Sequence, residues 1–247
     1  MTMMERPLLS VIVPTVGRPS LERTVNSLLR QGEWLPYEVV LVGDTFAGTW
    51  AEQLPRARAL AERYPERVRY VECDGGQHAW GHPQRNHGAT VARGRYLSWL
   101  GDDDVYVRFA FPAIARALRS RVFDHPRDQR VFLFRWIAPW KQVLWHTAGF
   151  LQQDHIDAEC IICPNVPEKL GVWSNRYQGD YDFIRETVDH WGGLSRVIWQ
   201  PEVIAQAQPS EAEDWTNGGG EVAPVRAEER VLSVLVPHVL EPAEVPA

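Results

Sequence analysis

Apolar runs of strand length alternate with helical segments over the first half of this chain. The runs span residues 9–13, 37–42, 68–71, 96–100 and 131–136. Each has the short, continuous apolar character of a buried strand. Strands that alternate with helices build βαβ units, whose parallel strands share one sheet. We therefore predict an α/β fold with a mainly parallel central sheet flanked by helices.

Three segments between these runs carry helix signals. Ser20 is a suitable N-cap for a helix whose apolar residues follow at helical spacing. Residues 49–52 resemble a capping box, although Pro55 shortens or displaces the helix behind it. Pro83 opens a third helix, which we expect to end near Gly94.

The alternation weakens in the second half. Residues 137–179 are rich in Trp, Pro, Gly and Asn, which favours short strands joined by long loops. Residues 183–191 then return to helical spacing, and the chain ends in an acidic segment of small residues and prolines. We predict one domain over residues 1–208 and a loosely attached tail over residues 209–247.

Composition narrows the class of protein. The 247 residues are 45% hydrophobic and 23% charged, as in globular proteins, and the net charge of −6 gives no general footprint for nucleic acid. No apolar run reaches the ~18 residues that span a membrane, and the N-terminus lacks the apolar core of a signal peptide. We expect a cytoplasmic protein that binds no nucleic acid.

The three cysteines do not indicate a disulfide framework. Cys160 and Cys163 form a C-x-x-C pattern, but no second such pair or histidine pair follows at zinc-finger spacing. Their neighbours are typical of a buried strand, so we expect both thiols to pack as small hydrophobic groups. A metal or redox role is the alternative.

Eleven tryptophans are unusual for a chain of this length. Tryptophan joins a large apolar face to one N–H donor, which suits protein cores and also contacts with sugar rings. Trp80, Trp140 and Trp145 lie in polar, loop-like surroundings. They are therefore candidates to line a cleft.

Three adjacent carboxylates, Asp102, Asp103 and Asp104, directly follow the predicted strand 96–100. In open α/β sheets, ligands bind beyond the carboxyl ends of the strands. Neighbouring carboxylates are costly there unless a cation joins them, and Mg²⁺ favours one or two carboxylates together with phosphate oxygens. The run thus indicates a cation carrying a diphosphate. A solvated acidic turn or a helix N-cap is the alternative.

Four segments stand in a suggestive order along the chain. They are SVIVPTVGRP (10–19), EVVLVGDT (38–45), GHPQRNHG (81–88) continued by ARGRYL (92–97), and GDDD (101–104). Together they resemble the inverting nucleotide-sugar glycosyltransferases of family 2. The resemblance covers about residues 8–205 and implies a GT-A fold, a Rossmann-like nucleotide-diphospho-sugar transferase fold. The nucleotide-sugar half would span about 8–105 and the acceptor half about 106–208.

Two glycines depart from the family pattern. Gly43 replaces the first of two aspartates that usually end the second strand, which leaves only Asp44 to contact the base. Gly101 stands where many members carry the first aspartate of the DxD motif, so Asp103 is the residue expected to ligate the metal.

The resemblance implies a nucleoside site at the ends of the first two strands. Asp44 would accept a hydrogen bond from N3–H of uracil or thymine, as an ionised carboxylate can. Thr15 and Arg18 would line the nucleoside pocket. Ordinary turn roles are the alternative for all three.

The resemblance also assigns the diphosphate contacts. Arg85 would face the diphosphate, because its guanidinium matches phosphate oxygens, and Asn86 would shape the loop beside it. Asp103 would ligate Mg²⁺ or Mn²⁺, and Asp102 would contact the donor ribose or sugar. Asp104 would support the residues that make these contacts or act as a capping group. A solvent-facing arginine on a helix is the alternative for Arg85.

An inverting transferase also needs a base to take the proton of the attacking hydroxyl. Asp180 aligns best with the family's base, and Asp182 is the second choice. We expect a helix to begin near Phe183, so either aspartate would also suit its cap or dipole.

Four further residues are weaker candidates. His146, His155 and His190 are considered as a third metal ligand, against the usual packing or surface role of a lone histidine. Asn165 is a candidate for the acceptor side.

The sequence therefore predicts a metal-dependent inverting transferase that moves a sugar from a UDP- or dTDP-type donor to an acceptor hydroxyl. The acceptor class stays open between carbohydrate, lipid-linked and small-molecule acceptors, as does peripheral membrane association. One rival is a nucleotidyltransferase, although its G-x-G-x-R loop is missing after the first strand. The other is a degenerate sugar-nucleotide or carbohydrate-binding module without turnover, which Gly43 and Gly101 motivate.

Overall fold

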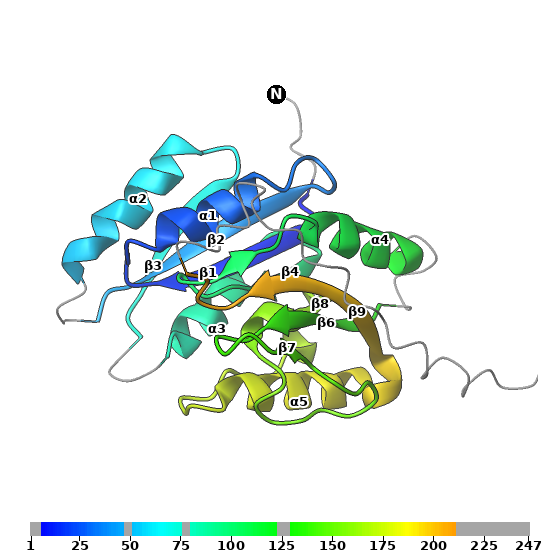
Figure 1. Cartoon of the computed structure of the whole chain (residues 1–247). Helices are drawn as coiled ribbons and strands as arrows, with labels where there is room; N and C mark the ends of the chain where they lie inside the picture. The colour runs from blue at the N-terminus through cyan, green and yellow to red at the C-terminus, as the bar shows by residue number, and fades with distance from the viewer. Residues whose placement is uncertain (1–5, 47–50, 76–79, 123–128, 211–247) are drawn as a thin grey trace, which may run out of the picture.

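The computed structural model describes residues 6–46, 51–75, 80–122 and 129–210. The predicted capping-box residue Thr49 and most of the predicted tail, residues 211–247, lie outside this part of the chain. Within the described residues, nine strands form one sheet in the order β3-β2-β1-β4-β8-β6-β9-β5, with β7 beside β6 (Figure 1).

The first half is a parallel α/β unit, as predicted. Its elements are β1 (Leu9–Thr15), α1 (Leu21–Leu29), β2 (Tyr37–Asp44), α2 (Leu54–Arg63), β3 (Val68–Cys73), α3 (His82–Val91) and β4 (Tyr96–Trp99). Strands β1 and β2, β2 and β3, and β1 and β4 pair in parallel. Strands β1 and β2 are buried along almost their whole length, as strands covered on both faces must be.

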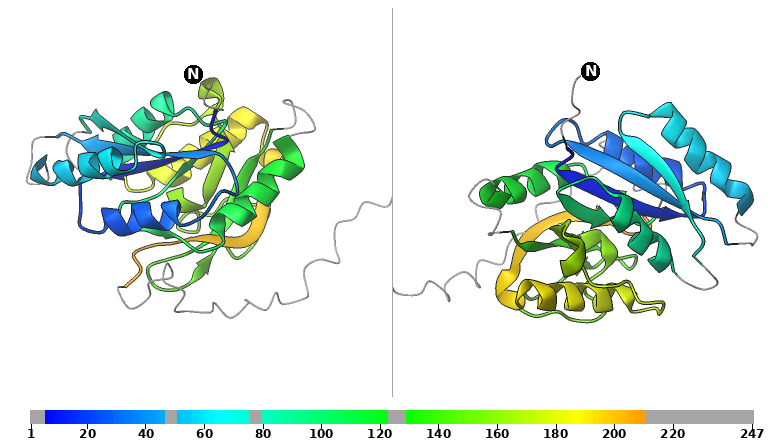
Figure 2. Two further views of the ribbon diagram at one scale, coloured as in Figure 1. Left: turned by 90° about the horizontal axis from the view of Figure 1, so that it is seen from above. Right: turned by 180° about the vertical axis from the view of Figure 1, so that it is seen from behind.

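The second half completes the sheet with mixed directions. It contains β5 (Val105–Tyr106), α4 (Ala110–Val122), β6 (Val131–Ile137), β7 (Val143–Leu144), β8 (Ile161–Pro164), α5 (Gly179–Trp191) and β9 (Val197–Gln206). Strand β8 is antiparallel to both β4 and β6, whereas β6 and β9 are parallel. Helices α1 and α2 lie on one face of the sheet, and α3 and α5 lie on the other (Figures 1 and 2).

Several local details differ from the predictions. Ser20 does precede α1, but its side chain makes no capping hydrogen bond. Pro55 lies in the first turn of α2, where its missing N–H costs nothing, and this helix begins at Leu54, so Pro55 displaces the start of the helix and does not shorten it. Helix α5 begins at Gly179 instead of near Phe183.

Aromatic side chains join the sheet to α5. Trp99 of β4 is fully buried and packs against Trp173 and against Phe183 of α5, with ring centroids 5.4 and 4.9 Å away. Trp173 in turn stacks on Phe183. Cys160 and Cys163 are buried and free, so the C-x-x-C pattern is core packing as predicted. This core fixes the start of α5 beside the carboxyl end of β4.

Candidate active site

A cavity of about 430 Å³ opens at the carboxyl ends of β1, β2 and β4. Its size is that of a small-molecule site. The predicted site residues that line it are Thr15, Arg18, Asp44, Arg85, Asp102, Asp103 and Asp180. The fold therefore brings together the first-choice residues for donor, metal and base.

Asp102 closes the end of β1. Its Oδ2 accepts hydrogen bonds from Thr15 Oγ1 (2.7 Å) and from the Val16 amide (3.3 Å). Burial raises the pKa of Asp102, while the Thr15 hydrogen bond and the charge of Arg18 act in the opposite direction. Thr15 and Asp102 thus form one hydrogen-bonded unit in the wall of the cavity.

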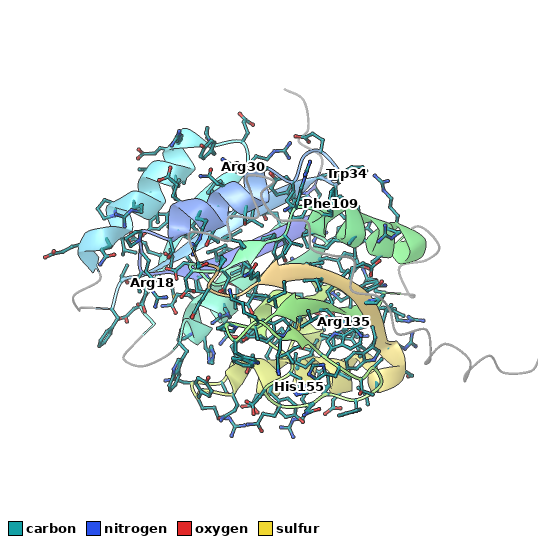
Figure 3. The ribbon with its side chains drawn as sticks, viewed as in Figure 1. Arg18, Arg30, Trp34, Phe109, Arg135 and His155 are labelled. Carbon is teal, nitrogen blue, oxygen red and sulfur yellow. The ribbon has the colours of Figure 1, made fainter. Side chains whose placement is uncertain are left out.

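Asp103 presents a partly exposed carboxylate to the cavity. Its Oδ2 lies 2.9 Å from Arg18 Nη1 and 3.3 Å from Gln208 Nε2. Arg18, which follows β1 and lines the cavity, is labelled in Figure 3. The Arg18 guanidinium therefore pairs with the carboxylate that was predicted to ligate the metal.

Asp104 is buried beneath this surface. Its Oδ1 accepts a hydrogen bond from the Gln208 amide at 2.9 Å, and Glu159 lies beside it. Burial raises the pKa of Asp104 and also that of Glu159, because two buried carboxylates in contact cannot both ionise readily. A Cβ at Gly101 would collide with the Asp104 carboxylate, so a side chain at this position would have to displace that carboxylate.

Asp44 ends β2 at the opposite wall. Its Oδ1 accepts hydrogen bonds from the amides of Phe46 (2.9 Å) and Gly75 (3.2 Å), so it shapes the local turn while lining the cavity. A Cβ at Gly43 would collide with the Tyr70 hydroxyl. The missing first aspartate of the family pair is thus explained by the tyrosine that fills its space.

Arg85 projects from the first turn of α3. It is buried, its Nη1 donates to the Trp80 carbonyl at 2.7 Å, and its guanidinium lies over the Trp173 ring. The alternative of a solvent-facing arginine is therefore wrong. Asn86 bonds both the amide and the carbonyl of Trp173, which fixes the loop beside Arg85 as predicted.

Asp180 lies in the first turn of α5 and faces the same cavity. Burial, followed by the charge of Asp157, raises the pKa of Asp180 to about 7. Its own hydrogen bond from the Tyr181 amide and the charge of Arg85 act in the opposite direction. A carboxyl group with this pKa exchanges protons near neutral pH, as a general base must.

Asp182 has a different role from the one predicted. Its carboxylate accepts hydrogen bonds from Ser174 Oγ (2.6 Å) and from the Arg176 guanidinium, which lowers the pKa of Asp182. It does not line the cavity and does not cap α5, because the helix begins three residues earlier.

The weaker candidates lie elsewhere. Asn165 donates to the carbonyls of Ala92 and Gly94, and it does not line the cavity. His146 and His155, the second of which is labelled in Figure 3, pack against each other, and neither lines the cavity. His190 lies near the end of α5.

Trp145 is also misplaced by the sequence argument. It is buried in the core, where its indole N–H donates to the Phe134 carbonyl and its ring packs edge-on against Trp199. Trp80 and Trp140 do line the cavity.

Among the cavity residues that sequence reasoning missed are Asp157, Glu159 and Gln208. Asp157 and Glu159 reach the site through the short helix η3 (Ala158–Cys160), and Gln208 follows β9. No local motif marks them, because they are brought to the site by strand pairing in the second half.

The model of glycosyl transferase family 2 matches residues 10–162. The chain belongs to this family. The family predicted from the order of the four segments is thus confirmed, and so is the predicted fold class. The matched residues include Asp44, Arg85 and the acidic run, whereas Asp180 lies beyond them.

This chain spans only part of the length of the relatives that it matches. An uncharacterized glycosyltransferase of Rickettsia bellii (strain RML369-C) is 29% identical over 101 residues, which are 40% of this chain and 13% of the relative. The crystal structure of S. aureus TarS has a TM-score of 0.58 at 16% identity and covers 84% of this chain and 37% of TarS. The structure of TarS 1-349 in complex with UDP-GlcNAc has a TM-score of 0.57 at 16% identity, with coverage of 87% and 61%.

No helix among the described residues is both long and apolar enough to cross a bilayer.

Proposed function

We propose that this chain is a metal-dependent inverting glycosyltransferase that moves a sugar from a nucleoside-diphosphate sugar to an acceptor hydroxyl. The observation that carries the proposal is the meeting of Asp103, Arg85 and Asp180 around one cavity. These three groups are a carboxylate for a cation, a buried guanidinium for phosphate oxygens and a carboxyl group poised near neutral pH.

A UDP-type donor is favoured. TarS, whose fold is similar, is described in complexes with UDP-GlcNAc and with UDP. In this chain, Asp44, Thr15 and Arg18 would bind the nucleoside and Arg85 the diphosphate. A dTDP-type donor presents the same N3–H to Asp44.

The acidic run fits Mg²⁺ or Mn²⁺ together with a diphosphate. The described residues hold no group of three or more His, Cys, Asp or Glu side chains arranged as a metal cage. Mg²⁺ needs no such cage, since it takes one or two carboxylates and completes its shell with phosphate oxygens and water. The carboxylates also converge on a glycine that leaves room for them. Asp103 would hold the ion, which when bound neutralises charge on the departing diphosphate.

The transfer is a single displacement. The acceptor oxygen forms a bond to the anomeric carbon, and the bond from that carbon to the diphosphate oxygen breaks. The electron pair of the broken bond leaves with the nucleoside diphosphate, and the hydroxyl proton passes to the Asp180 carboxylate. Attack from the face opposite the leaving group inverts the anomeric configuration.

Thermal denaturation with a panel of nucleoside-diphosphate sugars, with and without Mn²⁺, tests the donor and metal sites. Saturating donor at about a hundred times Kd stabilises a protein by roughly 2.7 kcal/mol, which is about 5–10 °C for a domain of this size. We expect such a shift with a UDP- or dTDP-sugar and Mn²⁺, and we expect Asp103→Ala to abolish it.

Glu66→Ala is the matched control, because Glu66 is an exposed acid that does not line the cavity. A donor shift that does not depend on Mn²⁺, or that survives Asp103→Ala, would contradict the metal site.

The structure weakens the case for a degenerate binding module. That rival rested on Gly43 and Gly101, and both glycines have steric reasons in this chain, namely the Tyr70 hydroxyl and the Asp104 carboxylate. Neither position therefore signals a decayed site. Turnover of the donor separates the two functions.

A further inference from the structure

Two aromatic side chains stand exposed at the mouth of the cavity. Trp80 is 52% exposed and Tyr177 is 69% exposed, and both line the cavity. Their ring centroids are 6.3 Å apart in an edge-on arrangement. Large aromatic groups left in water beside a cavity are typical of a surface that a ligand covers.

The backbone holds Trp80 in place. Its φ of +47° lies in the left-handed region, which a residue with a side chain seldom adopts without other contacts to hold it. The contact here is Arg85, which is buried and donates to the Trp80 carbonyl at 2.7 Å. The backbone of Trp80 is therefore held by a residue of the site itself.

This aromatic pair lies on the side of the base. Tyr177 precedes Asp180 by three residues at the start of α5. Arg85 links the pair to the base, since it bonds Trp80 and its charge acts on Asp180. The attacking hydroxyl must lie next to Asp180, so the pair flanks the acceptor.

The polar groups that line the cavity indicate which acceptor fits. Asp154, Asp157, Gln153 and Gln178 all line the cavity. Carboxylates and amides accept hydrogen bonds from hydroxyl groups, whereas the carboxylates repel anions. His82, beside the Trp80 ring, adds no positive charge, because burial and Arg85 lower the pKa of His82 to about 4.

We propose that Trp80 and Tyr177 form the acceptor subsite, which binds an uncharged pyranose ring by stacking while the neighbouring carboxylates and amides bind its hydroxyls. The proposal rests on the transferase function and specifies its substrate class. It excludes phosphorylated acceptors as the preferred class.

Direct binding of simple glycosides tests the subsite without turnover. Methyl glycosides of glucose, galactose, mannose and N-acetylglucosamine are titrated in the presence of UDP and Mn²⁺ and followed by saturation-transfer NMR. We expect at least one to bind the unmodified chain, with at least tenfold weaker binding to Trp80→Ala and to Tyr177→Ala. Trp80→Phe and Tyr177→Phe retain a ring and are expected to stay within about threefold.

Trp34→Ala is the matched control. Trp34 is 51% exposed but does not line the cavity, and its label in Figure 3 lies across the molecule from Arg18. We expect this variant to bind the glycosides and UDP as the unmodified chain does.

Three outcomes would overturn the subsite. They are no binding of any glycoside, tighter binding of glucose 6-phosphate than of methyl glucoside, and loss of UDP binding in Trp80→Ala, which would assign the pair to the donor. Failure of the transferase function looks different: no nucleoside-diphosphate sugar would then bind or turn over in the unmodified chain.

Discussion

At the scale of single residues, the cavity holds carboxyl groups in three environments. Asp103 is partly exposed and ion-paired, Asp104 and Glu159 are buried against each other, and Asp180 is partly buried beside a second acid. The same chemical group therefore occurs as an ion-paired carboxylate, as a buried acid beside a second buried acid, and as a carboxyl group with a pKa of about 7. Their environments differ, because burial disfavours the charged forms of Asp104, Glu159 and Asp180.

Asp180→Asn tests the base. The Asp180 pKa of about 7 means that the carboxylate form is lost below neutral pH, so the transfer rate should fall about tenfold per pH unit below pH 6 and level off above pH 8. Asp180→Asn should lower kcat by roughly 10²–10⁴ and leave the Kd of the donor unchanged. Initial rates of nucleoside-diphosphate release, measured between pH 5 and 9, check the pH profile and the fall in kcat. A rate that is flat from pH 5 to 9 would contradict Asp180 as the base.

Glu159→Gln tests the buried carboxyl pair through stability. The pKa of Glu159 is higher in the folded state than in the unfolded chain, so its stabilising effect is complete at low pH and is lost as the pH rises through the folded pKa. The amide keeps the shape and removes the titration. We expect urea denaturation to show that Glu159→Gln loses less stability than the unmodified chain between pH 5.5 and 8.5.

Glu168→Gln is the control for that experiment, because Glu168 is an exposed acid on the short helix η4 (Pro167–Lys169). An identical loss of stability in Glu159→Gln and in the unmodified chain would show that Glu159 is not held protonated.

Local sequence predicted some site residues and missed others for one physical reason. Asp103 directly follows a buried strand, and Asp180 lies next to a segment with helical periodicity. The neighbouring residues therefore indicate where each aspartate lies in the fold. Glu159 and Gln208 instead contact Asp104, which lies more than fifty residues away in sequence. Such pairings follow from strand order and have no local pattern.

At the scale of elements, α3 carries Arg85 to the cavity because it lies unusually close to the sheet. A Cβ at Gly88 of α3 would collide with a methyl group of Ile12 and would crowd Val42 at 3.2 Å. Only glycine permits this close packing of α3 on the sheet, and the position of α3 determines where the Arg85 guanidinium lies.

Gly88→Ala tests that packing. Alanine in a helix interior normally gains about 1 kcal/mol over glycine, whereas overpacking a core costs about 1–3 kcal/mol. We expect the steric cost to win, with a net loss of about 1 kcal/mol and a fall in Tm of about 2–4 °C. Calorimetry measures the change. Thr90→Ala, at an exposed position of the same helix, should shift Tm by less than about 1 °C, and a rise in Tm for Gly88→Ala would contradict the account.

Strands and helices with strong periodicity could be predicted, and those made by long-range pairing could not. All five predicted strands exist, and continuous apolar runs match the burial of β1, β2, β4 and most of β6, whereas β3 is mostly half-buried. Strand β5 is two residues long, so it has no periodicity to detect. The first turn of α5 contains Gly179 and two aspartates, which hides the helix start.

At the scale of the whole molecule, strand order unites the two halves at one cavity. Strand β8 inserts between β4 and β6, and β9 lies between β6 and β5. The insertion brings Asp157 and Glu159 to the acidic run, and β9 delivers Gln208 to it. The site therefore belongs to both halves, and neither half contains it alone.

Two shortened chains test the domain boundary predicted at residue 208. Gln208 donates to Asp103 and Asp104, and the Pro209 carbonyl accepts a hydrogen bond from Arg23. A chain ending at residue 206 leaves Asp104 without one hydrogen bond and should lose about 1–3 kcal/mol of stability. A chain ending at residue 210 should keep Tm and donor binding within error. Equal losses in both, measured by thermal denaturation, would place the boundary further along the chain.

The meeting of donor, metal and base residues at one cavity is tested by the release of nucleoside diphosphate from the stabilising donor, measured with Mn²⁺ for the unmodified chain, Asp103→Ala and Asp180→Asn. We expect release by the unmodified chain, loss of donor binding in Asp103→Ala, and retained binding without release in Asp180→Asn. If the unmodified chain binds the donor but releases no nucleoside diphosphate, whether the sugar is offered water or an acceptor, the transferase function is contradicted. The chain would then be a binding module.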